Sequence, residues 1–234
     1  MKLTTHTKLQ LKSLDYLYKS TELCEIMGRN KSDKGNKDLT RSHNYTTIYS
    51  LLFKELRSKP IELFELGLGT NNIDVPSNMG AGARPGASLY GWAEFFPEAK
   101  IYGADIDQRI LFKTERIHTF HCDQTNPDSI YELWNQQKIR DKQFDIIIED
   151  GYHNHYAQIC FFENSIHKVK PGGYYIIEDI NHGLPFNLMC EQFQYYKANN
   201  QYPDLDVSIY QLPTLNARLM ENGNNGLIII KNDR

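Results

Sequence analysis

Short apolar runs alternate with amphipathic stretches along most of the chain. The runs are apolar at successive positions, as in strands of a parallel sheet that is covered on both faces. They lie at residues 61–66, 100–106, 117–122, 144–150, 174–179, 206–212 and 226–231. Between them the spacing predicts helices at 87–96, 128–139, 155–169 and 186–199. This alternation predicts βαβ units with right-handed crossovers. We therefore expect an α/β, Rossmann-like fold with a seven-stranded, mostly parallel, doubly wound sheet.

The two ends of the chain depart from this alternation. The last two apolar runs are joined by residues 213–225, too short a connection for a long helix, which predicts a C-terminal antiparallel hairpin. Leucines at roughly helical spacing predict a helix over 8–27, and a second is predicted over 45–58. The intervening residues 28–44 contain almost nothing apolar, so we expect an exposed and mobile loop there. We accordingly divide the chain into an N-terminal helical extension, 1–59, and a main domain, 60–234.

Composition narrows the class of protein further. The chain has 234 residues and a net charge of −3, which fits a single main domain and argues against broad nucleic-acid binding. No apolar run approaches the roughly 20 residues that a membrane-spanning helix needs. The N-terminus lacks the apolar core of a secretory signal. The four cysteines are far apart and include no C-x-x-C pair, so we expect a reducing, cytoplasmic setting without disulfides or zinc.

The first predicted main-domain strand ends in a glycine turn. Gly67 and Gly69 follow Glu65 with one residue between each pair, and glycines let the backbone turn tightly and approach a ligand. Asn72 stands where a dinucleotide fingerprint has its third glycine, which disfavours a nicotinamide dehydrogenase. The acidic Glu65 suits a cationic ligand. An ordinary tight turn is the alternative interpretation.

The next two strands also end in polar residues. Asp105 ends the second strand, where an acid can accept hydrogen bonds from both hydroxyls of a ribose, and Asp107 can cap a helix. Asp123 and Gln124 end the third strand, where they could read the amino group of an adenine or simply form a turn.

These motifs together resemble those of the class I S-adenosylmethionine-dependent methyltransferases, over about residues 60–231. The resemblance implies that S-adenosyl-L-methionine is the cofactor and that it lies along the first three strand ends. The residues implied to bind it are Glu65, Gly67, Gly69, Ser88, Asp105, Asp123 and Gln124.

A second cluster follows the fourth and fifth strands. Asp150 ends the fourth strand, and Glu178 and Asp179 end the fifth. Crowded carboxylates repel one another unless a cation neutralises them, and an all-oxygen ligand set favours Mg²⁺ or Mn²⁺ over zinc. The alternative is that these acids have separate roles, as helix caps or solvated side chains. His153 lies three residues after Asp150 and is our candidate general base, with His155 and His182 as rivals.

The D-G-x-H sequence at 150–153 with the acid pair at 178–179 narrows the resemblance. It resembles the metal-dependent O-methyltransferases of macrolide and sugar tailoring, of the mycinamicin, tylosin and rhamnosyl types. The S-D-K-G sequence at 32–35 and the His43, Tyr45 and Tyr49 pattern resemble their N-terminal lid. The resemblance implies that Asp150, Glu178 and Asp179 bind Mg²⁺, with Asp150 and His153 at the reaction centre. The long loop 70–86 resembles methyltransferases of bacterial surface-glycan gene sets.

We therefore expect a Mg-dependent (or Mn-dependent) methyltransferase that acts on a sugar hydroxyl, in a glycan precursor such as that of a capsular polysaccharide or in a glycosylated metabolite. The expected partner is a small-molecule acceptor, a sugar or sugar nucleotide, with no nucleic acid and no membrane span. Homo-oligomer formation stays open. Two alternatives remain: a metal-independent methyltransferase acting on nitrogen or a phosphoryl-linked group, and a non-catalytic nucleotide-binding protein, because fold does not fix function.

Overall fold

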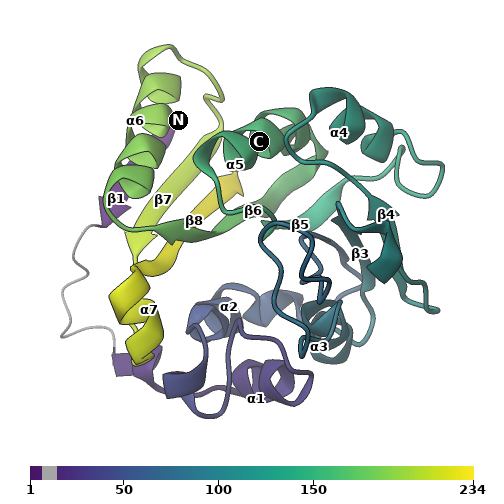
Figure 1. Cartoon of the computed structure of the whole chain (residues 1–234). Coiled ribbons are helices and arrows are strands. Elements are labelled where there is room, and N and C mark those ends of the chain that lie inside the picture. Colours follow the sequence, from purple (N-terminus) through teal and green to yellow (C-terminus); the bar gives the residue numbers. More distant parts are fainter. Residues whose placement is uncertain (7–14) are drawn as a thin grey trace.

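The structure, a computed structural model, describes residues 1–6 and 15–234. Within these residues eight strands form a sheet of order β1-β7-β8-β6-β5-β2-β3-β4 (Figure 1). Neighbouring strands run parallel except where β8 pairs antiparallel with β6 and with β7. The strands are β1 Lys2–His6, β2 Glu62–Leu66, β3 Lys100–Asp105, β4 Ile117–His121, β5 Phe144–Glu149, β6 Val169–Asn181, β7 Leu205–Gln211 and β8 Asn224–Asn232. The predicted mostly parallel sheet and C-terminal antiparallel pair are confirmed.

Helices cover both faces of this sheet (Figure 1). Those on one face are α4 Pro127–Trp134, α5 His155–Ser165 and α6 Leu184–Ala198. Those on the other are α1 Glu22–Arg29, α2 Tyr45–Leu52 and α3 Ala87–Phe95. The short α7, Ala217–Asn222, lies between β7 and β8. The sheet is therefore doubly wound, as the alternating pattern predicts.

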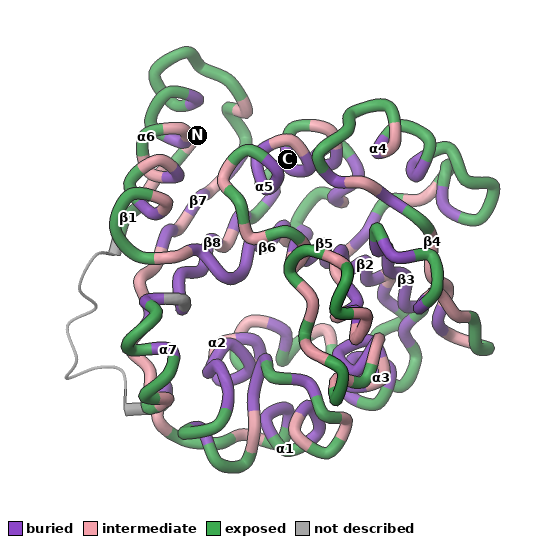
Figure 2. The backbone as a smooth tube through the Cα atoms, viewed as in Figure 1, coloured by how far each residue is buried: buried purple, intermediate pink, exposed green. Residues whose placement is uncertain are grey.

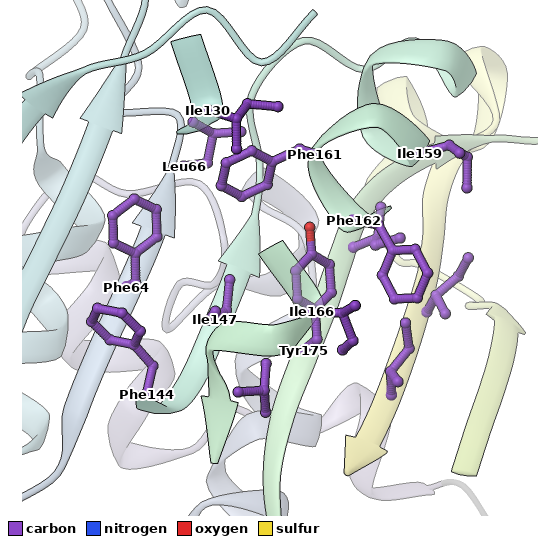
Figure 3. Close-up of a cluster of buried hydrophobic side chains, with 14 of the residues drawn as sticks. Phe64, Leu66, Ile130, Phe144, Ile147, Ile159, Phe161, Phe162, Ile166 and Tyr175 are labelled. Carbon is purple, nitrogen blue, oxygen red and sulfur yellow. The ribbon is translucent and has the colours of Figure 1, made fainter. Parts of the chain in front are cut away.

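Each face of the sheet has its own apolar core. Phe64 of β2 packs into the core under α4 and α5, against Phe161 (Figure 3) and against Trp134. Its neighbour Leu63 points the other way, into the core that includes Trp92 of α3. Successive strand residues thus enter opposite cores, which explains why the central strands are apolar at every position. Figure 2 shows the buried residues concentrated along these central strands.

The sheet has one more strand than the pattern predicts. Residues Lys2–His6 pair in parallel with β7 at the edge of the sheet. In this segment only Leu3 is strongly apolar, because an edge strand has a single neighbour and needs less apolar surface. The N-terminal helix predicted over 8–27 is also shorter: α1 starts at Glu22, a 3₁₀ turn covers Asp15–Tyr18, and residues 7–14 lie outside the described residues.

The prediction that residues 28–44 form an exposed loop is confirmed for the loop but wrong for much of its exposure. Ser32, Lys34, Leu39, His43 and Asn44 are all buried. The segment follows α1, includes a 3₁₀ turn at Leu39–Arg41, and leads into α2. The Lys34 side chain is buried because its partners, Asp150 and Glu178, lie at the carboxyl-terminal parts of β5 and β6, as described below.

Smaller differences concern helix ends. The helix predicted over 45–58 is α2 followed by a 3₁₀ turn at Lys54–Leu56, and that predicted over 155–169 is α5 followed by one at Ile166–Lys168. A further 3₁₀ turn, Gln108–Ile110, follows β3. Among the described residues, no helix is both long enough and apolar enough to cross a membrane.

Candidate active site

A cavity of about 290 Å³ opens at the carboxyl ends of the central strands. This is where ligands bind in open α/β sheets, and the volume is near the lower end of the usual range for ligand pockets, about 300–1,000 Å³. All the residues that the sequence singles out for the site line the cavity, apart from Glu65 and Glu178, which are fully buried. Those lining it are Gly67, Gly69, Ser88, Asp105, Asp123, Gln124, Asp150, His153 and Asp179.

The glycine turn after β2 is required by a close backbone approach. Gly67 has φ +91° and Gly69 has φ +71°, both in the left-handed region. A Cβ on Gly67 would lie 1.8 Å from the backbone oxygen of Asp150. The first glycine therefore lets the turn after β2 pack directly against Asp150, the residue that follows β5. This contact joins the glycine turn to the acid cluster.

Glu65 is held by neutral donors beside the turn. Its carboxylate accepts hydrogen bonds from the hydroxyl of Ser88 and from the indole nitrogen of Trp92, both on α3. Burial raises the pKa of Glu65, and Lys34, whose Nζ lies 3.7 Å from Oε1, opposes that shift. Ser88 thus positions Glu65 as well as lining the cavity.

Asp105 lines the cavity and also ties two strand ends together. Its Oδ2 accepts from the backbone nitrogen of Leu68 at 2.8 Å, and its Oδ1 from that of Asp107 at 2.9 Å. Each oxygen still has a lone pair for another donor. Burial raises the pKa of Asp105, while these backbone hydrogen bonds oppose that shift.

Asp107 caps a turn and also anchors a loop, and the sequence pattern predicts only the first of these roles. It caps the 3₁₀ turn after β3, as the capping interpretation predicts, by accepting from the backbone nitrogen of Arg109. Its Oδ2 also accepts from Thr70 at 2.6 Å and Asn72 at 2.7 Å. Arg109 in turn pairs with Asp74. Asp107 therefore anchors the start of loop 70–86, one wall of the cavity.

Asp123 and Gln124 make turn contacts, which were the alternative to their contacting an adenine. The Asp123 carboxylate accepts from the backbone nitrogen and the hydroxyl of Thr125. Gln124 donates through Nε2 to Glu149 at 2.9 Å, and its Oε1 accepts from the backbone nitrogen of Tyr152 at 2.6 Å. The Gln124 amide is thus engaged in fixing the loop after β5, although the residue borders the cavity.

The ends of β5 and β6 bring acids and an imidazole together. Ligand atoms of Asp150, His153 and Asp179 all lie within 4.8 Å of one another. His153 Nε2 is 3.2 Å from Oδ1 of Asp150, and Nδ1 is 3.6 Å from Oδ2 of Asp179. Asp179 has φ +56°, a strained conformation for a residue with a side chain. The two carboxylates offer the oxygen ligands that a hard divalent cation prefers, with the imidazole beside them.

A buried lysine in this cluster was missed in the sequence. Lys34 is 2% exposed, and its Nζ donates to Oδ2 of Asp150 at 2.5 Å and to Oε2 of Glu178 at 2.7 Å. Two tyrosines of α2 complete the set: Tyr49 donates to Oε1 of Glu178 at 2.6 Å, and Tyr45 to Oδ1 of Asp179 at 2.7 Å. Only the S-D-K-G resemblance pointed to Lys34, because its own neighbourhood in sequence is polar.

The charged groups of this cluster shift one another's pKa values. Burial alone would lower the pKa of Lys34, but Asp150 and Glu178 outweigh it, and the pKa lies well above its usual value. Burial would raise the pKa of Asp150, but Lys34 and His153 hold it below the usual range. Burial would lower the pKa of His153, yet Asp179 and Asp150 raise it to about 10. The single ammonium of Lys34 does not balance the negative charge of the surrounding carboxylates. Burial raises the pKa of Glu178, and Lys34 only partly opposes this.

The rival histidines lie elsewhere. His155 is the first residue of α5, burial lowers its pKa, and its Nδ1 has no hydrogen-bond partner among the described residues. His182 is exposed and follows β6. Neither lines the cavity, whereas His153 does. His153 therefore stays our candidate general base among the three.

The chain is similar in sequence to several curated O-methyltransferases. The chain is 34% identical over 139 residues to demethylmacrocin O-methyltransferase of Streptomyces fradiae, which covers 59% of this chain and 32% of that protein. It is 30% identical over 160 residues to 8-demethyl-8-(2-methoxy-alpha-L-rhamnosyl)-tetracenomycin-C 3'-O-methyltransferase of Streptomyces olivaceus, covering 68% of this chain and 37% of that one. The chain thus spans about a third of the length of these curated relatives. No protein-family model matches it.

A solved methyltransferase structure is also similar to this chain. The MycE methyltransferase from the mycinamycin biosynthetic pathway, in complex with Mg and SAH, is similar with a TM-score of 0.56 and 28% identity, over 70% of this chain and 38% of that one. The fold of the chain is the class I methyltransferase fold, and the resemblance to macrolide and sugar O-methyltransferases is confirmed.

Proposed function

We propose that the protein is an S-adenosylmethionine-dependent O-methyltransferase that modifies a sugar hydroxyl of a glycan precursor or a glycosylated metabolite. The observation that carries this proposal is a single cavity whose wall includes both the Gly67 turn and the Asp150–His153–Asp179 group. A cofactor on the first three strand ends would thereby lie next to groups suited to activating a hydroxyl. The sugar-modifying relatives support the acceptor class.

The residues present suit S-adenosylmethionine. The backbone of Gly67 and Gly69 can approach a ligand without a side chain in the way. Glu65, behind the cavity wall, would favour the cationic methionine end through its charge, and Asp105 keeps a lone pair on each oxygen for ribose hydroxyls. Asp123 lines the same cavity and would lie beside the adenine. The cofactor would supply a methyl group already activated by its sulfonium.

The acid cluster suits Mg²⁺ or Mn²⁺. Asp150 and Asp179 would hold the cation, and the motif resemblance adds Glu178 to its ligands. When bound, such a cation lowers the pKa of a hydroxyl that it coordinates. Asp150 would also orient His153, since its Oδ1 contacts Nε2.

His153 would accept the proton of the acceptor hydroxyl. A base must be neutral, and in this structure the two ion-paired aspartates favour the protonated imidazole. Neutralising those aspartates removes the interaction that holds the proton on His153. Charge at the two aspartates therefore sets whether His153 can act as a base. General-base help contributes typically about 10²–10⁴-fold.

We further propose that the N-terminal extension, residues 1–59, includes the lid of this site. Lys34, Tyr45 and Tyr49 support this, because all three donate hydrogen bonds to the acids at the ends of β5 and β6. The segment would exclude water from the reacting groups.

The proposed function is tested by two measurements on the same preparation. Calorimetry should detect S-adenosylhomocysteine binding, and mass spectrometry should detect a mass gain of one methyl group on a sugar or sugar-nucleotide acceptor. Binding without transfer to any sugar class, but with transfer to an amine or phosphoryl-linked acceptor, would contradict the O-methyl assignment. Neither binding nor transfer would contradict the methyltransferase assignment.

A further inference from the structure

We propose that Asp33 binds a second hydroxyl of the acceptor sugar, beside the hydroxyl that is methylated, and thereby selects sugars that carry both. This inference deepens the proposed function and rests on it, because it concerns the acceptor of the same site. Asp33 belongs to the S-D-K-G sequence at 32–35 and has no part in the cofactor and cation sites proposed above.

Asp33 differs from the other acidic residues of the cavity in having no donor. The cavity is also lined by Asp105, Asp123, Asp150 and Asp179. Each of these four carboxylates accepts a hydrogen bond from another group of the protein. Within residues 1–6 and 15–234, no group donates a hydrogen bond to the Asp33 carboxylate and no cation pairs with it. Its oxygens therefore keep their acceptor capacity for a ligand.

The Asp33 carboxyl lies in a concave part of the site, beside the acid cluster. The residue is exposed, yet burial by the surrounding protein raises its pKa, as expected for a side chain in a cavity wall. Asp150 and Asp179 raise that pKa further, so their charges act on it. Asp33 is nevertheless outside the group whose ligand atoms lie within 4.8 Å of one another. A sugar with one hydroxyl at that group can therefore present a neighbouring hydroxyl to Asp33.

The backbone on both sides of Asp33 is fixed by hydrogen bonds. Its carbonyl oxygen accepts from the backbone nitrogen of His43 at 2.8 Å. The nitrogen of Ser32 donates to the carbonyl oxygen of Met27 in the last turn of α1 at 3.0 Å, and that of Lys34 to Oγ of Ser32 at 3.3 Å. A carboxylate held in this way binds a hydroxyl without a large further loss of backbone freedom.

The surroundings of Asp33 favour a neutral donor over water alone. Asp150 and Asp179 repel its negative charge, and Lys34 and His43 oppose this only in part. A sugar hydroxyl donates to such a carboxylate and, unlike free water, is delivered to it by the rest of the bound acceptor. A site that is built to bond a substrate hydroxyl rejects the analogue that lacks it, because its own polar group is then left unpaired. Asp33 therefore acts on the choice of acceptor.

The test compares a sugar with its deoxy analogues. Methyl transfer is measured on the methyl glycosides of glucose, galactose, mannose and rhamnose, with Mg²⁺ and S-adenosylmethionine, and the best acceptor is then compared with its monodeoxy analogues. In the wild type, one analogue that keeps the methylated hydroxyl should lose at least tenfold in kcat/KM. In Asp33→Ala the same analogue should lose less than threefold relative to its parent glycoside, because the group that recognises the missing hydroxyl is absent.

Further measurements on Asp33→Ala separate acceptor binding from other roles. Its KM for the glycoside should rise at least tenfold, while its affinity for S-adenosylhomocysteine stays within threefold of wild type. Its Mn²⁺ affinity should fall far less than that of Asp179→Asn, which changes a proposed cation ligand. Its melting temperature should not fall, since the carboxylate has no protein partner to lose. Asp38→Ala is the matched control, an exposed acid of the same segment that does not line the cavity, and its KM should stay near wild type.

Three results would overturn the proposal. They are an equal loss for every deoxy analogue in wild type and Asp33→Ala, a loss of S-adenosylhomocysteine affinity as large as the rise in KM, and a loss of Mn²⁺ affinity as large as that of Asp179→Asn. If Asp33→Ala does not fold, Asp33→Asn takes its place. Cofactor binding without transfer to any glycoside would contradict the proposed sugar acceptor and this inference together. Normal transfer that is indifferent to Asp33 would contradict this inference alone.

Discussion

The ammonium of Lys34 lies 2.5 Å from Oδ2 of Asp150, a residue 116 positions further along the chain. This contact joins the N-terminal segment to the end of β5 and makes the segment part of the site. It also means that the acids at this edge of the sheet are held by protein cations as well as by any bound ion. The following predictions separate the roles of the residues around this contact.

Asp105 should be required for cofactor binding. Replacing it with alanine would leave the backbone nitrogens of Leu68 and Asp107 and the ribose hydroxyls without an acceptor, and each such loss is worth about 1–3 kcal/mol. Calorimetry should show S-adenosylhomocysteine binding weakened more than tenfold by Asp105→Ala. Unchanged affinity in the folded variant would show that Asp105 does not hold the ribose.

His153 should be required for turnover but not for cofactor affinity. His153→Ala should reduce methyl transfer by about 10²–10⁴-fold, the usual contribution of a general base. Its affinity for S-adenosylhomocysteine should stay near that of the wild type. His155→Ala is the matched control, because His155 does not line the cavity. An inactive His155→Ala beside a fully active His153→Ala would mean that the wrong histidine has been chosen.

Gly67 should not tolerate a side chain. A second glycine with positive φ, Gly172, separates the steric clash at Gly67 from the backbone strain that both positions share. Gly67→Ala places a Cβ 1.8 Å from the backbone oxygen of Asp150 and requires φ +91°. Gly172 also has a positive φ, +76°, but nothing lies within 4 Å of its Cβ position. Gly172→Ala should therefore cost only the strain of the left-handed conformation, about 1–2 kcal/mol. Thermal melting should show a clearly larger loss for Gly67→Ala, and equal losses would contradict the close approach to β5.

Asp107 should stabilise loop 70–86 in a pH-dependent way. Arg109, Thr70 and Asn72 hold the pKa of this carboxyl well below its usual range. A lowered folded-state pKa stabilises the fold above the unfolded-state pKa, about 3.9, and this stabilisation is lost as pH falls through the folded value. Asp107→Asn should thus lower the melting temperature at pH 7, with the difference from wild type narrowing below about pH 4. A difference independent of pH would exclude this ionic anchor.

The main sheet could be predicted because its strands are buried on both faces. A run such as 144–150 is apolar at nearly every position, and so it stands out from its surroundings. The strand Lys2–His6 does not, since an edge strand with polar alternate residues has no such run. The convergence of Asp150 and Asp179 was also predictable, because β5 and β6 are parallel neighbours whose carboxyl ends meet.

The contacts within the site were less predictable because they depend on distant partners. Lys34 lies in a polar segment, and nothing near it in the sequence indicates burial; its partners are Asp150 and Glu178. Gln124 could be placed at the cavity from its strand end, but its engagement with Glu149 follows only from the loop conformation after β5. Local patterns locate strand ends, whereas tertiary pairing decides which side chains remain free.

The central claim is that a cation held by the acid cluster activates the acceptor hydroxyl. Methyl transfer to a sugar acceptor is measured after exhaustive EDTA treatment, with and without added Mg²⁺, alongside S-adenosylhomocysteine binding on the same sample. We predict that chelation abolishes transfer, that Mg²⁺ restores it, and that cofactor binding stays largely intact, because most of the proposed cofactor residues lie at or just after the ends of β2, β3 and β4. Full transfer activity in the metal-free sample would contradict the claim.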